Sequence, residues 1–585
     1  MDKSRIKIGL SLIAILFASL IFSIESSPEF VYSIYSLYRI EILTISVILS
    51  TGAVLIVSDY FNDLNGAILF IMWLFTSTLF SLPLLANMKF YGRTGDALYH
   101  IGHLRTISIS GVLPSNIQYP NSHLLSYSVS SILDVSITHV VMFTPQIYFT
   151  ILVLSSILLC RYVDKVGKNI LILSPFLFIF SGNPTFHPYT FSIFLLPIFV
   201  FTIIYSNIDV RSAYLAVLFI FALALTHPIT GVIAAVSLVF ISVISYISHG
   251  GPDLKQIRLE KTKQIYALAL FALLITYSWI FYQSPFFFRL ITIRLIGFIS
   301  DPVGFLFTAS ELSGKAETAQ QGAAAGYNIY RIALQWYGPI LVGWILTVIS
   351  SFIIVYTKIR EEKKFGKDSI IILSFIFSGV VLSIVHPLTG FINVNPARPL
   401  PLVVVFFGWS FGKMVANIDF GLKSNHKKVI VLVIFALLFS VTMTNVFPDP
   451  INKKPNIQTT ETDFKGSEWL IENKNTTPKI YNFRTYQHRF SSYHIGSEAT
   501  KSRSDISRPG VANIRLDEHL TKYNGFNLSI DSESYVMISN FDILYANKYR
   551  DQSGFAGKIR LMKDDDTLNY IYSNGRFWTY KKIYY

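Results

Sequence analysis

The chain has 585 residues, of which 52% are hydrophobic and only 14% are charged. Because soluble domains carry about 25% charged residues, this composition excludes an ordinary soluble globular protein. The single cysteine, Cys160, excludes an intramolecular disulfide, a CxxC site and a metal centre built on thiolates. The net charge of +14 is spread through short connections between apolar runs, so it indicates membrane topology and gives no support to a nucleic-acid partner.

The apolar runs are long enough to cross a hydrocarbon core about 30 Å thick. The first run, residues 8–24, could pass for a signal peptide, but it lacks a small-residue cleavage site and is expected to be retained. Further spans are predicted at about 40–58, 65–85, 138–160, 169–181, 190–206, 212–226, 229–247, 265–282, 338–357, 368–386, 399–416 and 428–446. The predicted fold class is therefore mainly α, a polytopic transmembrane helical bundle of about thirteen spans surrounded by membrane lipid.

Basic clusters in alternate connections favour a multi-pass cell-membrane protein with a cytoplasmic N-terminus. In this topology residues 1–446 form a transmembrane domain with two outer loops, 86–137 and 283–337. After Pro448-Asp449-Pro450 the composition becomes polar, which predicts a small extracytoplasmic C-terminal domain of α/β or α+β type over 447–585. Its expected elements are a helix over 467–473 with Asp463 as a possible cap, strands at 479–483 and 534–539, and a hairpin around Asn574-Gly575.

The first outer loop contains one acid between Asn87 and Leu133, namely Asp96. In a helix, His100 and His103 would follow Asp96 on one face. A lone carboxylate just outside a span could be a general base that takes the proton of a hydroxyl nucleophile. Two alternatives are that Asp96 caps a short interfacial helix, or that Asp96, His100 and His103 hold a divalent cation. The loop also holds three further candidates for substrate binding, Arg105, Tyr119 and His123.

A short His-Pro-x-Thr motif recurs at three predicted outer helix ends, in residues 187–190, 227–230 and 386–389. Proline starts a helix well and threonine can help to cap its first turn, so one interpretation is a reused helix boundary. The functional interpretation is that His227 and His386 offer imidazole N–H donors to a phosphate or a substrate.

Arg398, in Asn395-Pro396-Ala397-Arg398-Pro399, is predicted to lie just above the hydrocarbon at the start of a late span. Its planar guanidinium suits an anionic phosphate, and the alternative is a simple interface anchor. The predicted membrane cores hold almost no ionisable residue, which argues against an ion-coupled transporter or a proton pump. Polar residues gathered at the outer boundary favour an interfacial enzyme instead.

This arrangement resembles the GT-C superfamily of membrane glycosyltransferases, and most closely its protein-mannosyltransferase and aminoarabinose-transferase types. The resemblance is carried by Asp96 in GDALYH, by GVLP and YPNSH in the first outer loop, by Arg398, and by the C-terminal YSNGRFWTYK. It implies metal-independent transfer of a sugar, without a cofactor, from a dolichyl or undecaprenyl phosphate donor to a glycan, lipid or protein acceptor. By the same resemblance Asp96 is the base and Arg398 a ligand of the donor phosphate.

Two other classes of function remain open from the sequence. A flippase or exporter of lipid-linked glycans would need polar residues along a path through the membrane midplane. A non-enzymatic envelope assembly protein would use the C-terminal domain as a binding module and would not depend on Asp96.

Overall fold

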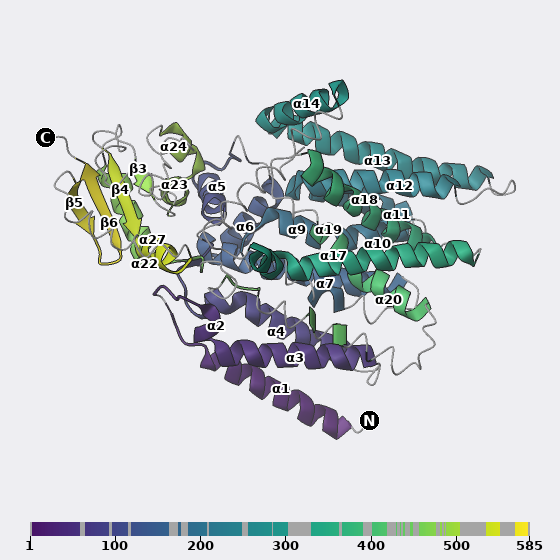
Figure 1. Cartoon of the computed structure of the whole chain (residues 1–585), viewed down its shortest axis with the longest axis horizontal. Coiled ribbons are helices and arrows are strands. Elements are labelled where there is room, and N and C mark those ends of the chain that lie inside the picture. The colour runs from purple at the N-terminus through teal and green to yellow at the C-terminus, as the bar shows by residue number, and fades with distance from the viewer. Residues whose placement is uncertain are drawn as a thin grey trace.

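The computed structural model arranges a long helical bundle beside a smaller mixed unit of helices and strands (Figure 1). It describes residues 3–27, 29–58, 65–92, 96–114, 117, 119–162, 173–176, 185–206, 210–247, 255–283, 285–301, 329–361, 366–389, 400–417, 429, 433–434, 437–438, 445–448, 456–474, 480–482, 485, 487–503, 534–549 and 568–582.

Thirteen helices in the described ranges build the bundle: α1 (Lys3–Ser23), α3 (Arg39–Ser58), α4 (Asn65–Leu85), α7 (Ile137–Tyr162), α9 (Pro188–Phe194), α10 (Leu196–Ser206), α11 (Val210–Thr226), α12 (Pro228–Ile247), α13 (Lys255–Gln283), α17 (Ile329–Arg360), α18 (Lys367–Thr389), α19 (Leu400–Val404) and α20 (Phe407–Asn417). Among the described residues, six helical stretches are long and apolar enough to cross a membrane, and four further apolar helices are shorter. The chain is thus a mostly helical, multi-pass membrane protein, as predicted.

The predicted number of about thirteen spans stays a prediction. Most of the predicted spans at 169–181 and 428–446 lies outside the described residues. The predicted span at 190–206 corresponds to α9 and α10, which are separated at Leu195, and that at 399–416 corresponds to α19 and α20. Both divided spans contain proline close to the break or the start, which limits continuous helical hydrogen bonding.

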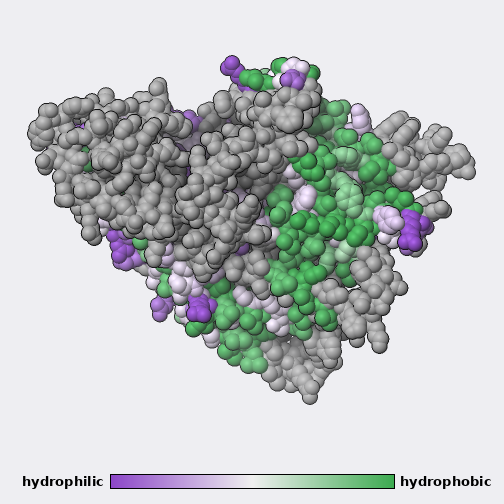
Figure 2. Space-filling view, in the orientation of Figure 1, coloured by the Kyte–Doolittle hydropathy of each residue, from purple (hydrophilic) through white to green (hydrophobic). Residues whose placement is uncertain are grey.

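On the face drawn in Figure 2, the described surface of the bundle is largely green and therefore apolar. Large side chains such as Phe22, Ile40 and Tyr214 are more than 70% exposed, which suits lipid as the surrounding solvent. Inside, buried hydroxyls donate to the carbonyl four residues earlier in their own helix, as Thr347 does to Gly343 and Ser374 to Ile370. These hydroxyls are thereby satisfied without water.

Three further helices lie outside the described spans: α2 (Ile34–Leu37), α5 (Ala97–Ser110) and α6 (Pro120–Leu133). Helices α5 and α6 lie between the bundle and the C-terminal sheet (Figure 1). A fourth, α14 (Pro285–Ser300), occupies the predicted second outer loop. Helix α5 ends at Gly111, whose φ of 69° is the left-handed conformation that glycine adopts without steric cost.

The residues from 456 to 582, here called the C-terminal segment, contain β2 (Gln458–Thr459), α22 (Glu461–Asn473), β3 (Ile480–Asn482), α23 (Gln487–Ile495), α24 (Ser497–Ser502), β4 (Tyr535–Ser539), α27 (Asn540–Tyr549), β5 (Leu568–Ser573) and β6 (Phe577–Lys582). Four strands form a sheet in the order β3-β4-β6-β5, with β3 and β4 parallel and the other pairs antiparallel. Strands β5 and β6 form the predicted hairpin, with Gly575 at a φ of 87°.

Helix α22 begins six residues earlier than predicted. Its N-cap is Thr460, and Asp463 is the third helical residue, whose carboxylate accepts from the Thr460 backbone N–H. The prediction of Asp463 as the cap was wrong, because a capping box uses both residues and the threonine occupies the first position. The predicted domain boundary at 447 stays a prediction.

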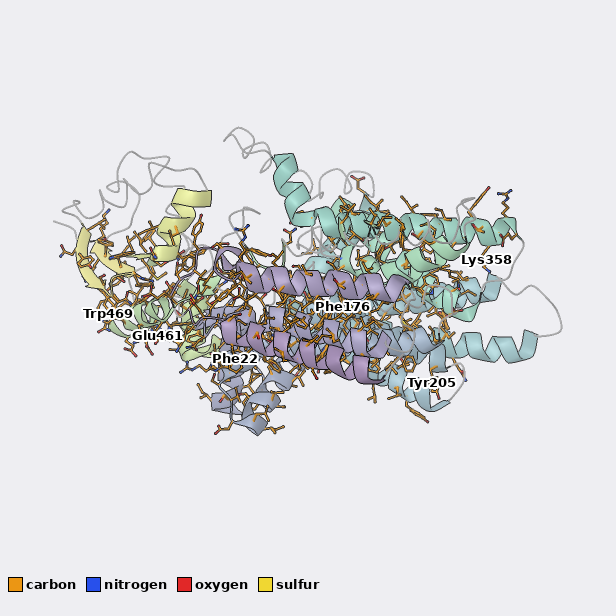
Figure 3. The ribbon with its side chains drawn as sticks, turned by 90° about the horizontal axis from the view of Figure 1, so that it is seen from below. Phe22, Phe176, Tyr205, Lys358, Glu461 and Trp469 are labelled. Atoms are coloured by element: carbon orange, nitrogen blue, oxygen red, sulfur yellow. The ribbon has the colours of Figure 1, made fainter. Side chains whose placement is uncertain are left out.

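The C-terminal segment is attached to the bundle through a two-stranded antiparallel sheet of β1 (Phe90–Tyr91) and β2. The buried Gln458 side chain accepts from the Val31 N–H and donates to the carbonyls of Ser27 and Glu29. Figure 3 places Glu461 and Trp469 of this segment at one end of the bundle, and Lys358 and Tyr205 at the other. The segment therefore lies opposite the basic end of α17, while the side of the membrane that it faces stays a prediction.

Candidate functional site

The carboxylate of Asp96 is exposed at the beginning of α5. Asp96 occupies the N-cap position, but its side chain makes no capping hydrogen bond. It instead forms an ion pair with Arg489 of α23, whose Nη2 lies 3.1 Å from the carboxylate Oδ1. The Asp96 side chain is 65% exposed and that of Arg489 only 17%. The capping alternative therefore fits the position of Asp96 but not its side chain.

Helix α5 packs against α23 and α24 so closely that one position excludes any side chain. A Cβ added at Gly102 would lie 2.6 Å from the carbonyl oxygen of Ser492, which is too close for any unstrained contact. Near the end of α5, Arg105 donates from Nη1 to the Tyr493 carbonyl oxygen over 2.9 Å. These contacts fix the beginning of α5, and with it Asp96, against the C-terminal segment.

On the other side of α5, three histidine rings are buried between α5 and α6. The Nδ1 atom of His100 lies 3.0 Å from Nε2 of His123, and Nδ1 of His123 lies 2.7 Å from the Tyr119 carbonyl oxygen. Burial lowers the pKa of His123 to about 4 and holds the pKa values of His100 and His103 well below the usual range. All three rings are neutral near pH 7.

Two further predicted rings, Tyr119 and His227, extend this cluster toward the bundle. Tyr119 is stacked on His227, with ring centroids 5.0 Å apart, and Tyr189 contacts the edge of His227 at 4.9 Å. His227 lies between α11 and α12, where its Nδ1 accepts from the Ile229 N–H over 3.3 Å. The helix-boundary interpretation thus fits His227. Because Nδ1 accepts, the proton of the neutral ring is on Nε2, which can act as a donor.

His103 faces the C-terminal segment from the same cluster. Its Nδ1 lies 2.9 Å from the hydroxyl oxygen of Ser497, the first residue of α24. Thr106 links the same two helices, because its Oγ1 accepts from the Ser497 backbone N–H over 3.0 Å. The C-terminal segment therefore contributes to both sides of α5.

The structure brings together five of the nine predicted site residues: His100, His103, Tyr119, His123 and His227. Asp96 stands at the start of α5, and its carboxylate pairs with Arg489. Arg105 is also on α5, but its guanidinium group hydrogen-bonds to α23. Arg398 lies outside the described residues, and so does the side chain of His386, which belongs to α18. The roles of all nine in substrate binding or catalysis stay predictions.

Sequence reasoning missed Arg489 and Ser497. Arg489 is 393 residues from Asp96 in the chain, and Ser497 is 394 residues from His103. Neither residue belongs to a short motif that would have signalled the contact. The mixture of arginine and histidine in the stretch from Gln487 to His494 was the only available sign.

The metal alternative for Asp96, His100 and His103 finds no matching donor arrangement in the described part of the chain. No group of three or more His, Cys, Asp or Glu side chains there is placed to hold a metal ion. Asp96 is directed to Arg489, while His100 contacts His123. The three predicted ligands therefore point to different partners.

Comparisons with known proteins give similar solved structures only. No family model matches the chain, and neither does any curated protein. ArnT from Cupriavidus metallidurans bound to undecaprenyl phosphate is similar with a TM-score of 0.44 and 9% identity, over 89% of this chain and 98% of that one. The apo state of ArnT gives a TM-score of 0.42 and 9% identity, over 86% and 97%.

The arabinofuranosyltransferase AftD from Mycobacteria is similar with a TM-score of 0.42 and 12% identity, over 87% of this chain and 39% of that one. These neighbours are GT-C membrane glycosyltransferases, and ArnT is of the aminoarabinose-transferase type that the sequence resembles.

Proposed function

We propose that the chain is a membrane glycosyltransferase that moves a sugar from a polyprenyl phosphate, dolichyl or undecaprenyl, to a hydroxyl group of a glycan, lipid or protein. The observation that carries this proposal is the Asp96 carboxylate, which leaves its helix uncapped and is held by Arg489. A carboxylate kept accessible in this way is suited to take a proton from a substrate.

The proposed reaction is a single displacement. The acceptor oxygen attacks the anomeric carbon and transfers its proton to Asp96, while the bond from that carbon to the phosphate oxygen breaks. The phosphate leaves with the electron pair, and the configuration at the anomeric carbon is inverted. Arg489 orients the carboxylate, because charge-assisted hydrogen bonds from a guanidinium have a defined direction.

The departing phosphate requires positive charge or hydrogen-bond donors. We assign this role to Arg398 and to the Nε2–H group of His227, with His386 as a further donor from the same motif type. Arginine suits it because its planar guanidinium binds two phosphate oxygens and stays charged. A site at the end of an apolar bundle suits a donor whose polyprenyl chain remains in the lipid.

The proposal is tested with the purified full chain in detergent and a mixed pool of polyprenyl-phosphate sugars. Sugar transfer and release of free polyprenyl phosphate are measured for the wild type, for Asp96→Asn and for Asp134→Asn. We expect Asp96→Asn to lower transfer by about 10²- to 10⁴-fold, the usual contribution of a general base.

Asp134→Asn is the matched control. Asp134 is an exposed aspartate at the end of α6 with a φ of 50°, a conformation that asparagine also adopts. EDTA in all reactions tests metal independence. Equal transfer by wild type and Asp96→Asn would contradict the base assignment, and transfer abolished by EDTA would contradict a metal-independent reaction.

A further inference from the structure

The ends of α5 and α6 expose apolar side chains, although neither helix belongs to a described span. Ile109 and Val112, at the end of α5, and Ile132 and Leu133, at the end of α6, are each more than 60% exposed. A single exposed apolar side chain is ordinary on a soluble protein. Several of them at the ends of two short helices indicate a contact with lipid or with another molecule.

The stretch of chain that carries these side chains has no charged residue. Between Arg105 and Asp134 the sequence contains no Asp, Glu, Lys or Arg. A surface that faces water usually carries about 25–35% charged residues of both signs, which keep it soluble. The exposed ends of α5 and α6 are therefore not typical of a surface that faces water.

The exposed ends of both helices continue into the apolar surface of two spans. Gln283, the last residue of the span in α13, donates from Nε2 to the carbonyl oxygen of Pro114 over 3.4 Å, beside the exposed Tyr282. A short turn joins Leu133 to α7, whose apolar stretch begins at Ile137. Helices α5 and α6 thus lie where two spans end, at the end of the bundle that carries the C-terminal segment (Figure 1).

We propose that the ends of α5 and α6 enter the bilayer at this end of the bundle. The inserted surface, here called the apolar ends, consists of Ile109, Val112, Leu113, Ile132 and Leu133. These side chains contact acyl chains at the level of the lipid headgroups, as those of interfacial helices do. Lipid is the occupant because the apolar ends adjoin spans whose exposed side chains already face lipid, and because they carry no charge.

Insertion of the apolar ends holds α5 from two directions. The C-terminal segment holds the beginning of the helix, where Asp96 pairs with Arg489, and the bilayer holds its end. The distance of the Asp96 carboxylate from the lipid surface is then fixed. The proposal goes beyond the proposed function and does not depend on it, because it concerns where α5 lies and not which reaction Asp96 serves.

The test uses nitroxide labels on single introduced cysteines in the full chain, reconstituted in phospholipid nanodiscs. Cys160 is buried, so the introduced cysteine is the reactive one, and wild type carried through the labelling checks this. Val112→Cys and Ile132→Cys place one label at each apolar end. Leu274→Cys, exposed within the span of α13, is the lipid standard, and Lys465→Cys, exposed on α22, is the water standard.

Electron paramagnetic resonance measures how often each label collides with oxygen, which concentrates in hydrocarbon, and with a nickel chelate, which stays in water. At both apolar ends we expect an oxygen-to-nickel collision ratio several-fold higher than that of Lys465→Cys and close to that of Leu274→Cys. A ratio equal to that of Lys465→Cys at either end would overturn the proposal. Protection of either label from both reagents would also overturn it, because a second copy or another protein would then cover the surface.

Ile109→Cys and Leu133→Cys provide a second label at each apolar end. They replace Val112→Cys or Ile132→Cys if either variant lowers the unfolding temperature in detergent. The collision ratios do not depend on sugar transfer. Failure of the transfer assay would therefore contradict the proposed function alone, and a water-like ratio would contradict lipid insertion alone.

Discussion

Helix α5 meets two regions of the molecule, and the two contacts differ in kind. Toward the C-terminal segment it presents charged groups that water can reach, Asp96 beside Arg489 and Arg105 beside the Tyr493 carbonyl. Toward α6 it presents the buried ring of His100, which stays neutral and contacts the neutral ring of His123 on α6. The buried ring of His103 instead contacts Ser497 of the C-terminal segment. Charge is retained where it can be solvated, and a fixed order of donors and acceptors is retained where water is excluded. In the proposed reaction the first side moves a proton.

On the side of α5 that faces the C-terminal segment, Arg489→Gln is expected to have the largest effect on sugar transfer. We expect transfer to fall by about 10- to 100-fold, because small displacements of a catalytic group carry losses of this size. In the double variant with Asp96→Asn the loss should not exceed that of Asp96→Asn alone, since the two residues act as a unit. The measurement is kcat/KM for sugar transfer.

The matched control for Arg489 is Arg576→Gln. Arg576 also pairs with a carboxylate, that of Glu29 at 2.7 Å, but the pair is exposed and lies away from α5. Fully additive losses in the double variant would mean that Arg489 does not act through Asp96.

The close packing of α5 against α23 is tested by Gly102→Ala. The new methyl group would lie 2.6 Å from the Ser492 carbonyl oxygen, so α5 and α23 must separate. We expect a loss of about 1–3 kcal/mol in stability, the usual result of overpacking, with reduced transfer. Thermal unfolding in detergent provides the measurement. Gly66→Ala on α4, where nothing lies within 4 Å of the new carbon, is the control, and an equal result for both would refute the tight contact.

The buried histidines between α5 and α6 are tested by changing the pH. Burial lowers the pKa of His123 to about 4, below its value near 6.5 in the unfolded chain. Between about pH 6.5 and 4 the unfolded state therefore binds more protons, and stability falls as the pH falls, by up to about 1.4 kcal/mol per pH unit for each such histidine. The unfolding temperature measured from pH 7.5 to 4.5 should drop, and His123→Gln should flatten the slope while His139→Gln leaves it unchanged. An unchanged slope in His123→Gln would show that other groups cause it.

The smallest effect is expected from an exposed ion pair at the contact between the bundle and the C-terminal segment. Lys89 pairs with Glu461 at 2.8 Å, and each side chain is 45% exposed. Solvent screening limits such a pair to about 0–1 kcal/mol, so Lys89→Gln should change the unfolding temperature only slightly. A loss as large as that of Gly102→Ala would mean that surface charge, and not close packing, holds the C-terminal segment in place.

The parts of the fold that could be predicted from the sequence are those that depend on local residue patterns. Apolar runs predicted the six described stretches that are long enough to cross a membrane, and Asn574-Gly575 predicted the hairpin. A short helix with Asp96 at its cap was one of the alternatives for the first outer loop. Each depends on residues a few positions apart, where helix period and turn chemistry determine the conformation.

The partners of these residues could not be predicted in the same way. The contacts of Asp96 with Arg489 and of His103 with Ser497 join positions nearly 400 residues apart. The chain from His100 to His123 also depends on how α5 packs on α6, because sequence alone does not say which ring nitrogen faces which neighbour. The tautomers of these rings are therefore determined by the tertiary structure, although the histidines themselves could be chosen as candidates from the sequence.

The strand pair of β1 and β2 has a consequence for biosynthesis. It joins Phe90 to Thr459, and the ion pair beside it waits for Arg489, so the ribosome must complete most of the chain before Asp96 meets its partner. Contacts this distant along the chain form late, because a very long loop must close first. An unfinished or truncated polypeptide inserted in the membrane would carry Asp96 without Arg489. In the proposed reaction, the base and its arginine partner are thus brought together only at the last stage of synthesis.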